Sequence, residues 1–422
     1  MRLTLPVLFT CALLSVANLS FGANRFWIAA GPSNWNNTAN WSNATGGAGG
    51  FSVPIAGDIV TFDGNGLGNC TIDVAVAVGR ITVAAAYSGT ISQGANTISV
   101  TGTTSFGGGT FTGGSANITF AGAFTLSGAA IFTSTSATLE FQNNTAFTGG
   151  TFNHNNGSVR YNCAAGITFS GNGPTFYNLE IVGQGFTINI TATAITVANT
   201  FTISGTGALT INTGTINANG DIVVSNSATG GGGTGMVNIS GTVNQNFVGG
   251  PAAGDGALPQ LTINKTAGTL TLSNFPSIAN NFTYAAGTIS AGTSNFCFTR
   301  AGTSPYTITG SVTLNSISFI ANTNLTATIA AGTTITCVAD MTIAGSANIT
   351  LNTGTINVAG NLILTNTGAA GGGSATININ GTGAQNIDGS AITGNQCLLP
   401  IVTINASGTV SLLGNISFSG NL

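Results

Sequence analysis

Asn212-Thr213-Gly214-Thr215-Ile216-Asn217 recurs unchanged as Asn352-Thr353-Gly354-Thr355-Ile356-Asn357, and this pair of hexapeptides decides the fold. Around them, residues 195–247 align without a gap on residues 335–387, and about 23 of some 53 positions are identical. The offset is about 140 residues, which indicates an internal repeat rather than a series of unrelated globular domains.

Apolar and polar residues alternate with a period of two inside the repeat, as in a strand with one buried face. The pattern is clearest in Phe201–Ile203, Leu209–Ile211, Ile222–Val224, Val237–Ile239, Leu261–Ile263 and Leu270–Leu272. Turn-forming residues such as Ser204–Gly207 separate these segments. No stretch shows the i, i+3, i+4 spacing of a long helix, so the sequence predicts an all-β fold.

A shorter self-match favours a solenoid over an array of sandwiches. Residues 108–111 followed by 118–120 resemble residues 149–152 followed by 159–161, at an offset of about 41 residues. This offset suits two stacked coils of about 20 residues each. We therefore predict a parallel β-helix, or β-solenoid, of roughly 19 coils, on the order of 90 Å long at ~4.8 Å per coil.

The N-terminus has the pattern of a secretory signal peptide. Arg2 precedes a mostly apolar run, Leu3–Ala17, and small residues before Ala23 offer a cleavage point, so we assign residues 1–22 to the signal. Cys11 belongs to this apolar run, which is shorter than the ~20 residues that cross a bilayer. No second long apolar run follows. The sequence thus predicts a secreted mature chain without a transmembrane segment.

The N-terminal part of the mature chain does not fit the repeat and holds all three tryptophans, Trp27, Trp35 and Trp41. An uncovered solenoid end exposes unpaired backbone groups, so we predict a cap and the first coils in residues 23–80. The remaining divisions are expected to be coils at 81–144, long repeat 1 at 145–281 and long repeat 2 at 282–422. Asn421-Leu422 aligns with Asn281-Phe282, which predicts an open C-terminal end and a chain that continues.

Trp35–Ser42, followed by Val53–Phe62, resembles a recurrent start of large secreted bacterial β-helix repeat proteins of the Bacteroidetes type. Gly157–Tyr161, Phe176–Ile181 and Gly383–Ile387 fit the same style. Many such proteins are surface or adhesin-like, and family members often end in a C-terminal sorting domain. The resemblance implies a cell-surface protein built of glycine- and threonine-rich coils.

Five cysteines remain once the signal is removed: Cys70, Cys163, Cys297, Cys337 and Cys397. Their odd number and wide spacing, without any Cys-x-x-Cys, argue against a disulfide framework and against a zinc site. Cys337 aligns with Val197 in the repeat. We predict that cysteine serves here as a small, buried apolar residue.

Charged residues are few: the chain has nine acidic and six basic residues, and one basic residue, Arg2, lies in the signal. Enzymatic β-helices need paired carboxylates, or acidic calcium ligands with a basic partner. We identify no stripe of charge at coil spacing, and we expect Asp58, Asp63 and Asp73 to be turn and strand-end residues. The sequence therefore predicts a non-enzymatic protein without catalytic, cofactor-binding or metal-binding residues.

Two further candidates are weak. Asp63–Asn69 alternates Asp and Asn as a calcium loop does, but Leu67 occupies the third ligand position and no closing Glu follows, so we predict a glycine-rich turn. His154 is the single histidine and lies in an Asn-rich segment. It has no nearby nucleophile to activate, and we predict a solvated loop residue.

Comparison of the two copies of the repeat indicates the roles of several other residues. Asp221 aligns with Asn361, and Lys265 aligns near Ala406, so neither charge is expected to be required. The glycine runs 230–233 and 371–373 occupy the same place in the two copies, and no Lys-Ser/Thr follows them as in a phosphate-binding loop. We interpret both runs as flexible loops projecting from the rod. Nucleic acid is an unsuitable partner because the chain has no basic patch and a net charge of −3.

Thr-x-Thr pairs suggest one minor hypothesis, since flat threonine arrays on a β-solenoid can bind ice. The candidates are Thr110/Thr112, Thr200/Thr202, Thr213/Thr215, Thr269/Thr271, Thr334/Thr336 and Thr353/Thr355. Their spacing along the chain is irregular. Two outward threonines around one core residue explain them more simply.

Together these observations predict a secreted or cell-surface, adhesin-like structural protein, a non-catalytic stalk or scaffold of a larger protein. Its expected partners are surface glycans or other cell-surface components. The alternative is a carbohydrate-active β-helix enzyme of the polysaccharide lyase or hydrolase kind, and the minor alternative is an ice-binding β-solenoid.

Overall fold

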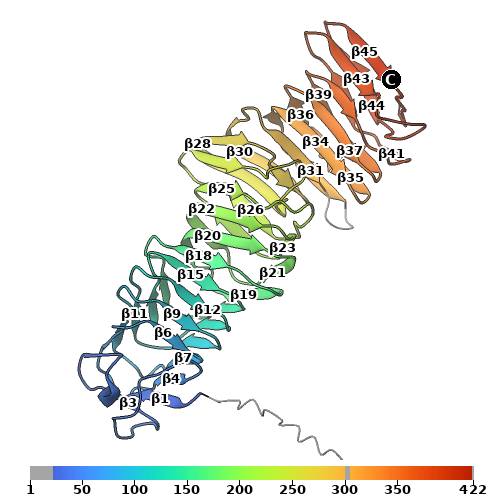
Figure 1. Cartoon of the computed structure of the whole chain (residues 1–422). Coiled ribbons are helices and arrows are strands. Elements are labelled where there is room, and N and C mark those ends of the chain that lie inside the picture. The colour runs from blue at the N-terminus through green and yellow to red at the C-terminus, as the bar shows by residue number, and fades with distance from the viewer. Residues whose placement is uncertain (1–21, 300–304, 421–422) are drawn as a thin grey trace, which may run out of the picture.

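The structure, a computed structural model, describes residues 22–299 and 305–420. The chain forms one elongated rod that runs from the Trp-containing segment at one end to β45 at the other (Figure 1). It is a β-solenoid of about 17 turns, with coils about 21 residues apart. The predicted all-β parallel solenoid is therefore confirmed, with two turns fewer than estimated. The predicted signal peptide, except Gly22, and Asn421-Leu422 lie outside the described residues.

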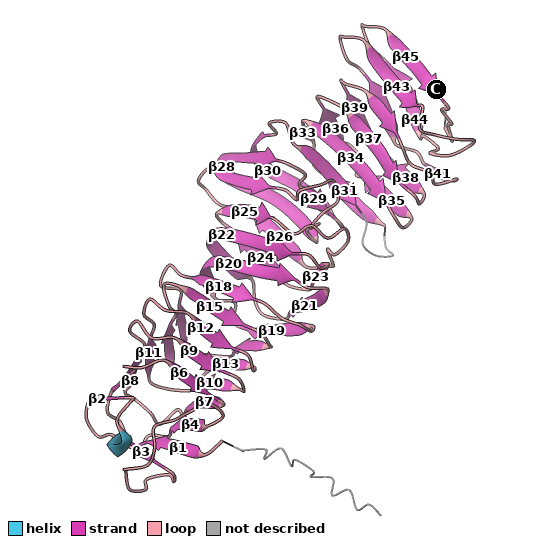
Figure 2. Ribbon diagram, viewed as in Figure 1, coloured by secondary structure: helices cyan, strands magenta, loops and turns pink. Residues whose placement is uncertain are grey.

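Five sheets make up the rod, and strands joined by loops and turns account for nearly all of its regular secondary structure (Figure 2). The first sheet contains β3 (Trp41–Ser42), β1 (Asn24–Trp27), β4 (Ile59–Phe62), β7 (Arg80–Val83), β10 (Thr104–Phe106), β13 (Phe124–Leu126), β16 (Thr145–Phe147), β19 (Ile167–Gly171), β21 (Phe186–Ile190) and β23 (Leu209–Asn212). The second contains β2 (Ser33–Asn34), β5 (Cys70–Thr71), β8 (Thr90–Ser92), β11 (Thr110–Thr112), β14 (Ile131–Thr133) and β17 (Thr151–Asn153). One 3-10 turn, η1 (Thr38–Asn40), precedes β3.

The third sheet links the two halves of the rod. Its strands are β6 (Val76–Val78), β9 (Ile98–Val100), β12 (Ile118–Phe120), β15 (Thr138–Phe141), β18 (Ser158–Tyr161), β20 (Thr175–Gly183), β22 (Ile195–Gly205), β24 (Thr215–Ala218), β25 (Asp221–Val224), β26 (Met236–Ile239), β27 (Gln245–Val248), β28 (Gln260–Ser273), β30 (Phe282–Ser290), β32 (Tyr306–Thr309), β35 (Leu325–Ile329), β38 (Ile349–Asn352) and β41 (Gly371–Gly372). The long strands β22 and β28 each pair with two shorter ones, so they cover two faces of a coil.

Two sheets complete the C-terminal half. The fourth contains β29 (Ser277–Ile278), β31 (Asn295–Thr299), β34 (Ser316–Ala321), β37 (Met341–Gly345), β40 (Leu362–Leu364), β43 (Gln385–Gly389) and β45 (Val410–Gly414). The fifth contains β33 (Val312–Leu314), β36 (Thr334–Cys337), β39 (Thr355–Val358), β42 (Thr376–Ile379) and β44 (Ile401–Ile404).

Alternation within each short strand builds the core. In β12, Ile118 and Phe120 point inward and are buried, while Thr119 between them is partly exposed. Parallel in-register pairing repeats this choice on the next coil and stacks like on like, as in Phe111, Phe132 and Phe152 of the second sheet. The rings of Phe111 and Phe132 are 4.7 Å apart and nearly parallel. All six segments predicted from period-two alternation are strands, although Leu261–Ile263 and Leu270–Leu272 both belong to β28.

The three tryptophans pack together at the first end of the rod. Trp27 and Trp41 lie in β1 and β3, which form an antiparallel pair on the edge of the first sheet. Their ring centroids are 5.2 Å apart, and Trp35 lies 4.8 Å from Trp41. Trp41 donates its indole N–H to the carbonyl of Trp35, and Phe62 of β4 contacts all three rings. This cluster covers the core of the first coils.

Buried amides occupy the same corner in both copies of the repeat. Asn226 donates to the carbonyls of Ser204 and Gly207, both at 3.0 Å, and accepts the Ala228 N–H at 2.9 Å. Its counterpart Asn366 donates to two carbonyls and accepts the Gly368 N–H in the same manner. Each amide is about 1% exposed and satisfies backbone groups that a corner would otherwise bury unpaired.

The strands of the second copy of the repeat are rotated about the rod axis relative to the first copy, so that each lies in the position of the next sheet. β38 is the repeat counterpart of β23, yet it stacks through β35, β32, β30, β28 and β26 on β24. The counterpart of β24 is β39, which lies in the fifth sheet between β36 and β42. The 140-residue unit is therefore not a whole number of coils.

The glycine runs are part of the ladder, so their interpretation as flexible projecting loops is wrong. Gly232 bridges to Thr210 of β23 and Gly231 bridges to Ala257, while β41 is Gly371–Gly372 itself and pairs with β38. All four residues from Gly230 to Gly233 have φ between 95° and 105°. Glycine is needed because this backbone approaches the coil below in a conformation that a side chain opposes.

Substituting Gly231→Ala should destabilise the rod more than Gly230→Ala. Both residues have positive φ, so each substitution introduces backbone strain of about 1–3 kcal/mol. A Cβ at Gly231 would also lie 2.4 Å from the Leu209 carbonyl oxygen, whereas one at Gly230 would meet nothing within 4 Å. Thermal unfolding followed by circular dichroism should show the larger loss of Tm for Gly231→Ala. Equal losses would contradict a ladder role for Gly231.

Candidate functional site

One row of charged side chains crosses three successive coils on the outer face of the third sheet. Glu140 of β15 is in register with Arg160 of β18, which is in register with Glu180 of β20. Arg160 Nη1 lies 3.4 Å from Glu140 Oε2, and Arg160 Nε lies 3.3 Å from Glu180 Oε2. The guanidinium therefore bridges two carboxylates that are two coils apart, a backbone separation of about 9.6 Å.

Neighbouring polar groups orient both carboxylates. Gln142 donates its amide N–H to Glu140 Oε1, and Ser204 donates its hydroxyl to Glu180 Oε1. The Arg160 side chain is 36% exposed and that of Glu180 is 32% exposed, so water screens the pair, while Glu140 is more enclosed at 16%. Two carboxylates on either side of one guanidinium form an ion row, and a substrate that used them would have to displace Arg160.

The expectation that no charged stripe exists at coil spacing is wrong for these three residues. Glu140, Arg160 and Glu180 follow one another at intervals of 20 residues, which is the coil length predicted from the shorter self-match. The signal was therefore present in the sequence. It lies outside residues 195–247, where the long alignment compares the two copies.

The three N-terminal aspartates anchor separate backbone turns. Asp58 is buried and accepts the Ala23 N–H at 2.8 Å and the Ile55 N–H at 3.1 Å. Asp63 accepts the Asn65 N–H, and Asp73 accepts the Asn36 N–H. Each carboxylate thus has its own turn. Among the described residues, no group of three or more His, Cys, Asp or Glu side chains could hold a metal ion.

The Asp63–Asn69 segment is a turn that serves the Trp cluster. The Gly68 carbonyl accepts hydrogen bonds from the Trp27 indole at 2.9 Å and from the Tyr87 hydroxyl at 3.0 Å. A Cβ on Gly68 would lie 2.1 Å from the Gly31 carbonyl oxygen, which explains the glycine. The backbone carbonyl at the seventh position of such a calcium loop would be that of Asn69, and here it accepts the Ser33 N–H at 2.9 Å.

His154 caps a turn. Its Nδ1 accepts the backbone N–H of Asn156 at 3.0 Å, and its ring lies 5.5 Å from that of Tyr177. Asn155 and Asn156 both have φ near 50°, the conformation that asparagine tolerates best after glycine. The residue is half-buried, so it is less solvated than predicted.

The repeat explains why Asp221 can be replaced by asparagine. Asp221 Oδ1 accepts the Asn246 N–H at 2.8 Å, and Asn361 Oδ1 accepts the Asn386 N–H at 2.9 Å in the second copy. The site needs a side-chain oxygen and not a charge.

The sequence comparison treats the Lys265 charge as dispensable, but the structure gives this residue three hydrogen-bond partners. It is 2% exposed, and its ammonium donates to the carbonyls of Gly241 and Val243 and to Gln245 Oε1. Desolvation lowers the pKa of this ammonium. All three of its donors are used within the fold, so Lys265 braces a corner and presents no free amine.

The paired threonines do not share one plane. Thr110/Thr112 lie in the second sheet, Thr200/Thr202 and Thr269/Thr271 in the third, and Thr334/Thr336 in the fifth, while Thr213 and Thr353 occupy corners with φ of 55° and 50°. Polar pairs of this kind stack on successive coils in β8, β11, β14 and β17, where Ile131 interrupts them, and in β36, β39 and β42 of the fifth sheet.

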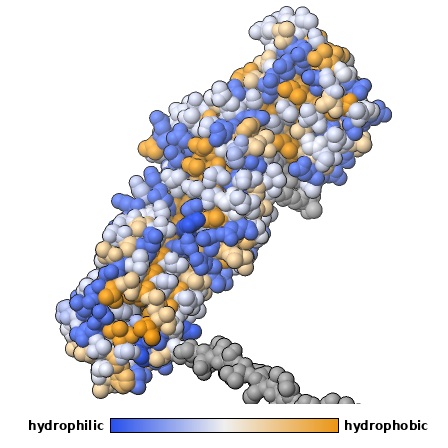
Figure 3. Space-filling model, in the orientation of Figure 1, coloured by the Kyte–Doolittle hydropathy of each residue, from blue (hydrophilic) through white to orange (hydrophobic). Residues whose placement is uncertain are grey.

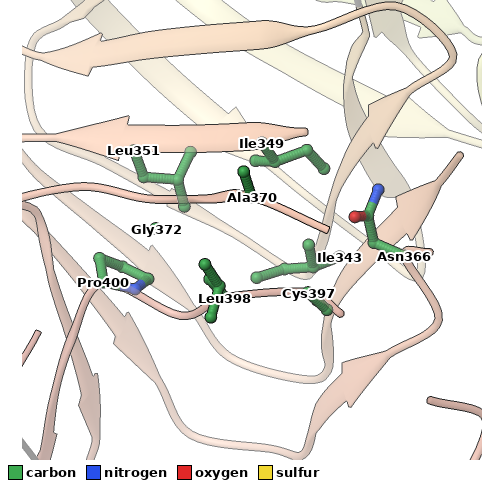
Figure 4. Close-up of a pocket in the computed structure, with 9 residues that line it drawn as sticks. All are labelled: Ile343, Ile349, Leu351, Asn366, Ala370, Gly372, Cys397, Leu398 and Pro400. Carbon is green, nitrogen blue, oxygen red and sulfur yellow. The ribbon is translucent and has the colours of Figure 1, made fainter. Parts of the chain in front are cut away.

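Two hollows, of about 240 and 280 Å³, lie beside Gly149–Phe152 and beside Gly254 and Thr299, and neither is lined by a charged side chain of the described residues. A gap in the interior beside Gly372 and Pro400 is too narrow for a water molecule (Figure 4), and its lining includes Ile343, Ile349, Leu351, Cys397 and Leu398.

Among residues 22–299 and 305–420, no helix has the length and hydropathy needed to span a bilayer.

Replacing Arg160 by glutamine should lower the free energy of unfolding by about 0.5–1 kcal/mol at low salt, because it leaves Glu140 and Glu180 without their shared cation. The difference from wild type should shrink in 1 M salt, which screens exposed charges. Arg80→Gln is the matched control, since exposed Arg80 forms no ion pair with a described residue. Denaturant unfolding at both salt concentrations measures the effect. Identical losses in the two variants would refute a stabilising ion row.

The five cysteines should resist thiol reagents in the folded protein. All are buried and none is paired. Burial raises the pKa of Cys163 and Cys337 to about 12 and that of Cys297 and Cys397 to about 11, and it also raises the pKa of Cys70. Thiolate is thus scarce at pH 8. Labelling with a chromogenic disulfide should be slow until denaturant is added, and rapid native labelling of any of these thiols would contradict this role.

No model of a known protein family matches the chain, and neither a curated protein nor a solved structure shows significant similarity to it.

Proposed function

We propose that this chain is a secreted or cell-surface structural protein, an adhesin-like stalk or scaffold that is not an enzyme and binds through its extended outer faces. The observation that carries the proposal is one uncharged column of outward side chains in unbroken register over seven coils. Its members are Thr175, Thr196, Asn217, Asn238, Thr262, Thr283 and Thr309.

The column has the chemistry of a carbohydrate-binding face. Hydroxyls and amides both donate and accept hydrogen bonds, as sugar hydroxyls do, and none of the seven side chains carries charge. Asn238 donates to Asn217 Oδ1 at 3.0 Å, and Asn378 donates to Asn357 Oδ1 at 2.9 Å in the second copy. These amide ladders fix side-chain direction at a coil spacing of about 4.8 Å, so less ordering is needed on binding.

The visible surface supports binding along an extended face rather than binding in a pocket. Polar, intermediate and apolar residues are interspersed along the rod in Figure 3, without one dominant patch of either kind. We further propose that residues 1–22 direct secretion, and that in the cell the rod continues into further repeats or a C-terminal sorting domain. Fusing residues 1–24 to a reporter tests the secretion step, and retention of the reporter inside the cell would contradict it.

Binding of neutral surface polysaccharides should depend on this column. A variant with Asn238→Glu and Thr262→Glu should lose about tenfold in affinity, because two carboxylates replace neutral hydrogen-bonding groups. The matched control carries Ser105→Glu and Thr125→Glu, which occupy an outward column of the first sheet. Binding is measured with the chain immobilised against a panel of neutral and charged glycans. Equal loss in both variants, or no binding by the wild type, would contradict the proposal.

A carbohydrate-active enzyme is the second candidate, and the row of Glu140, Arg160 and Glu180 is the observation that favours it. Two carboxylates facing the same side of one sheet could act as acid and base if a substrate displaced the arginine. Incubation with the same glycans should release no reducing ends. Release that Glu140→Gln or Glu180→Gln abolishes would establish this candidate and overturn the structural proposal.

A further inference from the structure

The last coil leaves apolar side chains uncovered. Leu412 and Leu413 of β45 are 52% and 38% exposed, and Ile404 at the end of β44 is 44% exposed. Elsewhere in the rod, residues at inward positions of such strands are buried, as in β43 beneath β45. The backbone of β45 pairs with β43 on one side only. The end of the rod is therefore an apolar surface bordered by an unpaired strand edge.

The first copy of the repeat shows what fits this surface. Leu412 pairs with Ile387 as its counterpart Leu272 pairs with Phe247, and Ile404 pairs with Ile379 as Ile263 pairs with Ile239. Leu272 is 1% exposed and Ile263 is 0% exposed. The same positions are thus buried in one copy and open in the other.

The cover in the first copy is β30. It pairs with β28 at Leu261–Asn264 and again, after a shift in register, at Thr269–Thr271, so that Tyr284 stacks on Ile263 and Ile289 stacks on Leu270. Phe282 at its start is fully buried and stacks on Leu261. The single parallel strand β30, with Phe282, Tyr284 and Ile289 facing inward, therefore covers both halves of β28.

We infer that the face formed by β44 and β45 is a coil-accepting surface whose occupant is a parallel β-strand segment with the chemistry of residues 281–299. The selectivity comes from two features acting together: backbone hydrogen bonds to the β45 edge, and large apolar side chains that fill the positions above Ile404 and above Val410, the counterpart of Leu270. The inference rests on the proposed scaffold function, but its readout is backbone protection and requires no glycan.

The test uses the full chain with residues 281–299 duplicated directly after Gly420. Amide hydrogen exchange of residues 410–414 should slow by about tenfold or more relative to the wild type, because a new strand would pair with β45. Binding of an apolar dye should fall as Leu412 and Ile404 become covered. The matched control carries the same duplication with Asp at the positions copied from Tyr284 and Ile289, and its β45 amides should exchange as in the wild type.

A peptide of residues 277–299 added in trans to the wild-type chain keeps the test independent of how well the fusion folds. It should protect residues 410–414, and the peptide with Tyr284→Asp and Ile289→Asp should not. The inference is overturned if neither format protects β45 or if the Asp versions protect equally. Protection of β45 in the wild type that rises with protein concentration, with dimers in sedimentation, would assign the face to a second copy and also overturn it. A chain that passes this test but binds no glycan would refute only the proposed ligand class.

Discussion

In-register parallel pairing between successive coils is the constraint on which the rest of the structure depends. Each coil contributes short strands whose hydrogen bonds are completed by the coils above and below, so a residue's environment is set by its counterpart about 21 residues away. Apolar residues stack on apolar residues inside, and Thr, Ser and Asn stack outside. Stability is then roughly a sum over neighbouring coils, and few charged residues are needed to keep the outer faces soluble.

At the corners between strands, backbone N–H and C=O groups lack partners in the ladder, and specific side chains satisfy them. Asn226 and Asn366 satisfy carbonyls that turn inward, and glycines with positive φ allow the chain to approach the coil beneath. Lys265 braces one such corner in the first copy, where the second copy has Ala406 nearby. The polar residues with the most distinctive environments therefore form hydrogen bonds to backbone groups. Most of the candidate functional residues stabilise turns and corners.

Strand positions, inward residues and the roles of the cysteines could be predicted from the sequence, because period-two alternation and internal repetition are both local signals. The charged row at Glu140, Arg160 and Glu180 could also have been found, since its spacing equals the coil length. Other features could not. Gly231 and Gly232 pair with neighbouring coils through φ values that glycine can adopt, but a glycine in the sequence does not show which φ value it takes. The burial of Lys265 depends on where the chain turns a corner.

The rotation of the second copy of the repeat relative to the first has a geometrical consequence for recognition. The column through Asn217 and Asn238 and its counterpart through Asn357 and Asn378 belong to different sheets, so they look outward in different directions. A flat surface such as a cell wall can touch only one of them at a time, whereas a flexible polymer can wind around the rod and engage both. Under the proposed carbohydrate-binding function, rolling the rod about its long axis would exchange one column for the other, so contact would not require a single fixed orientation.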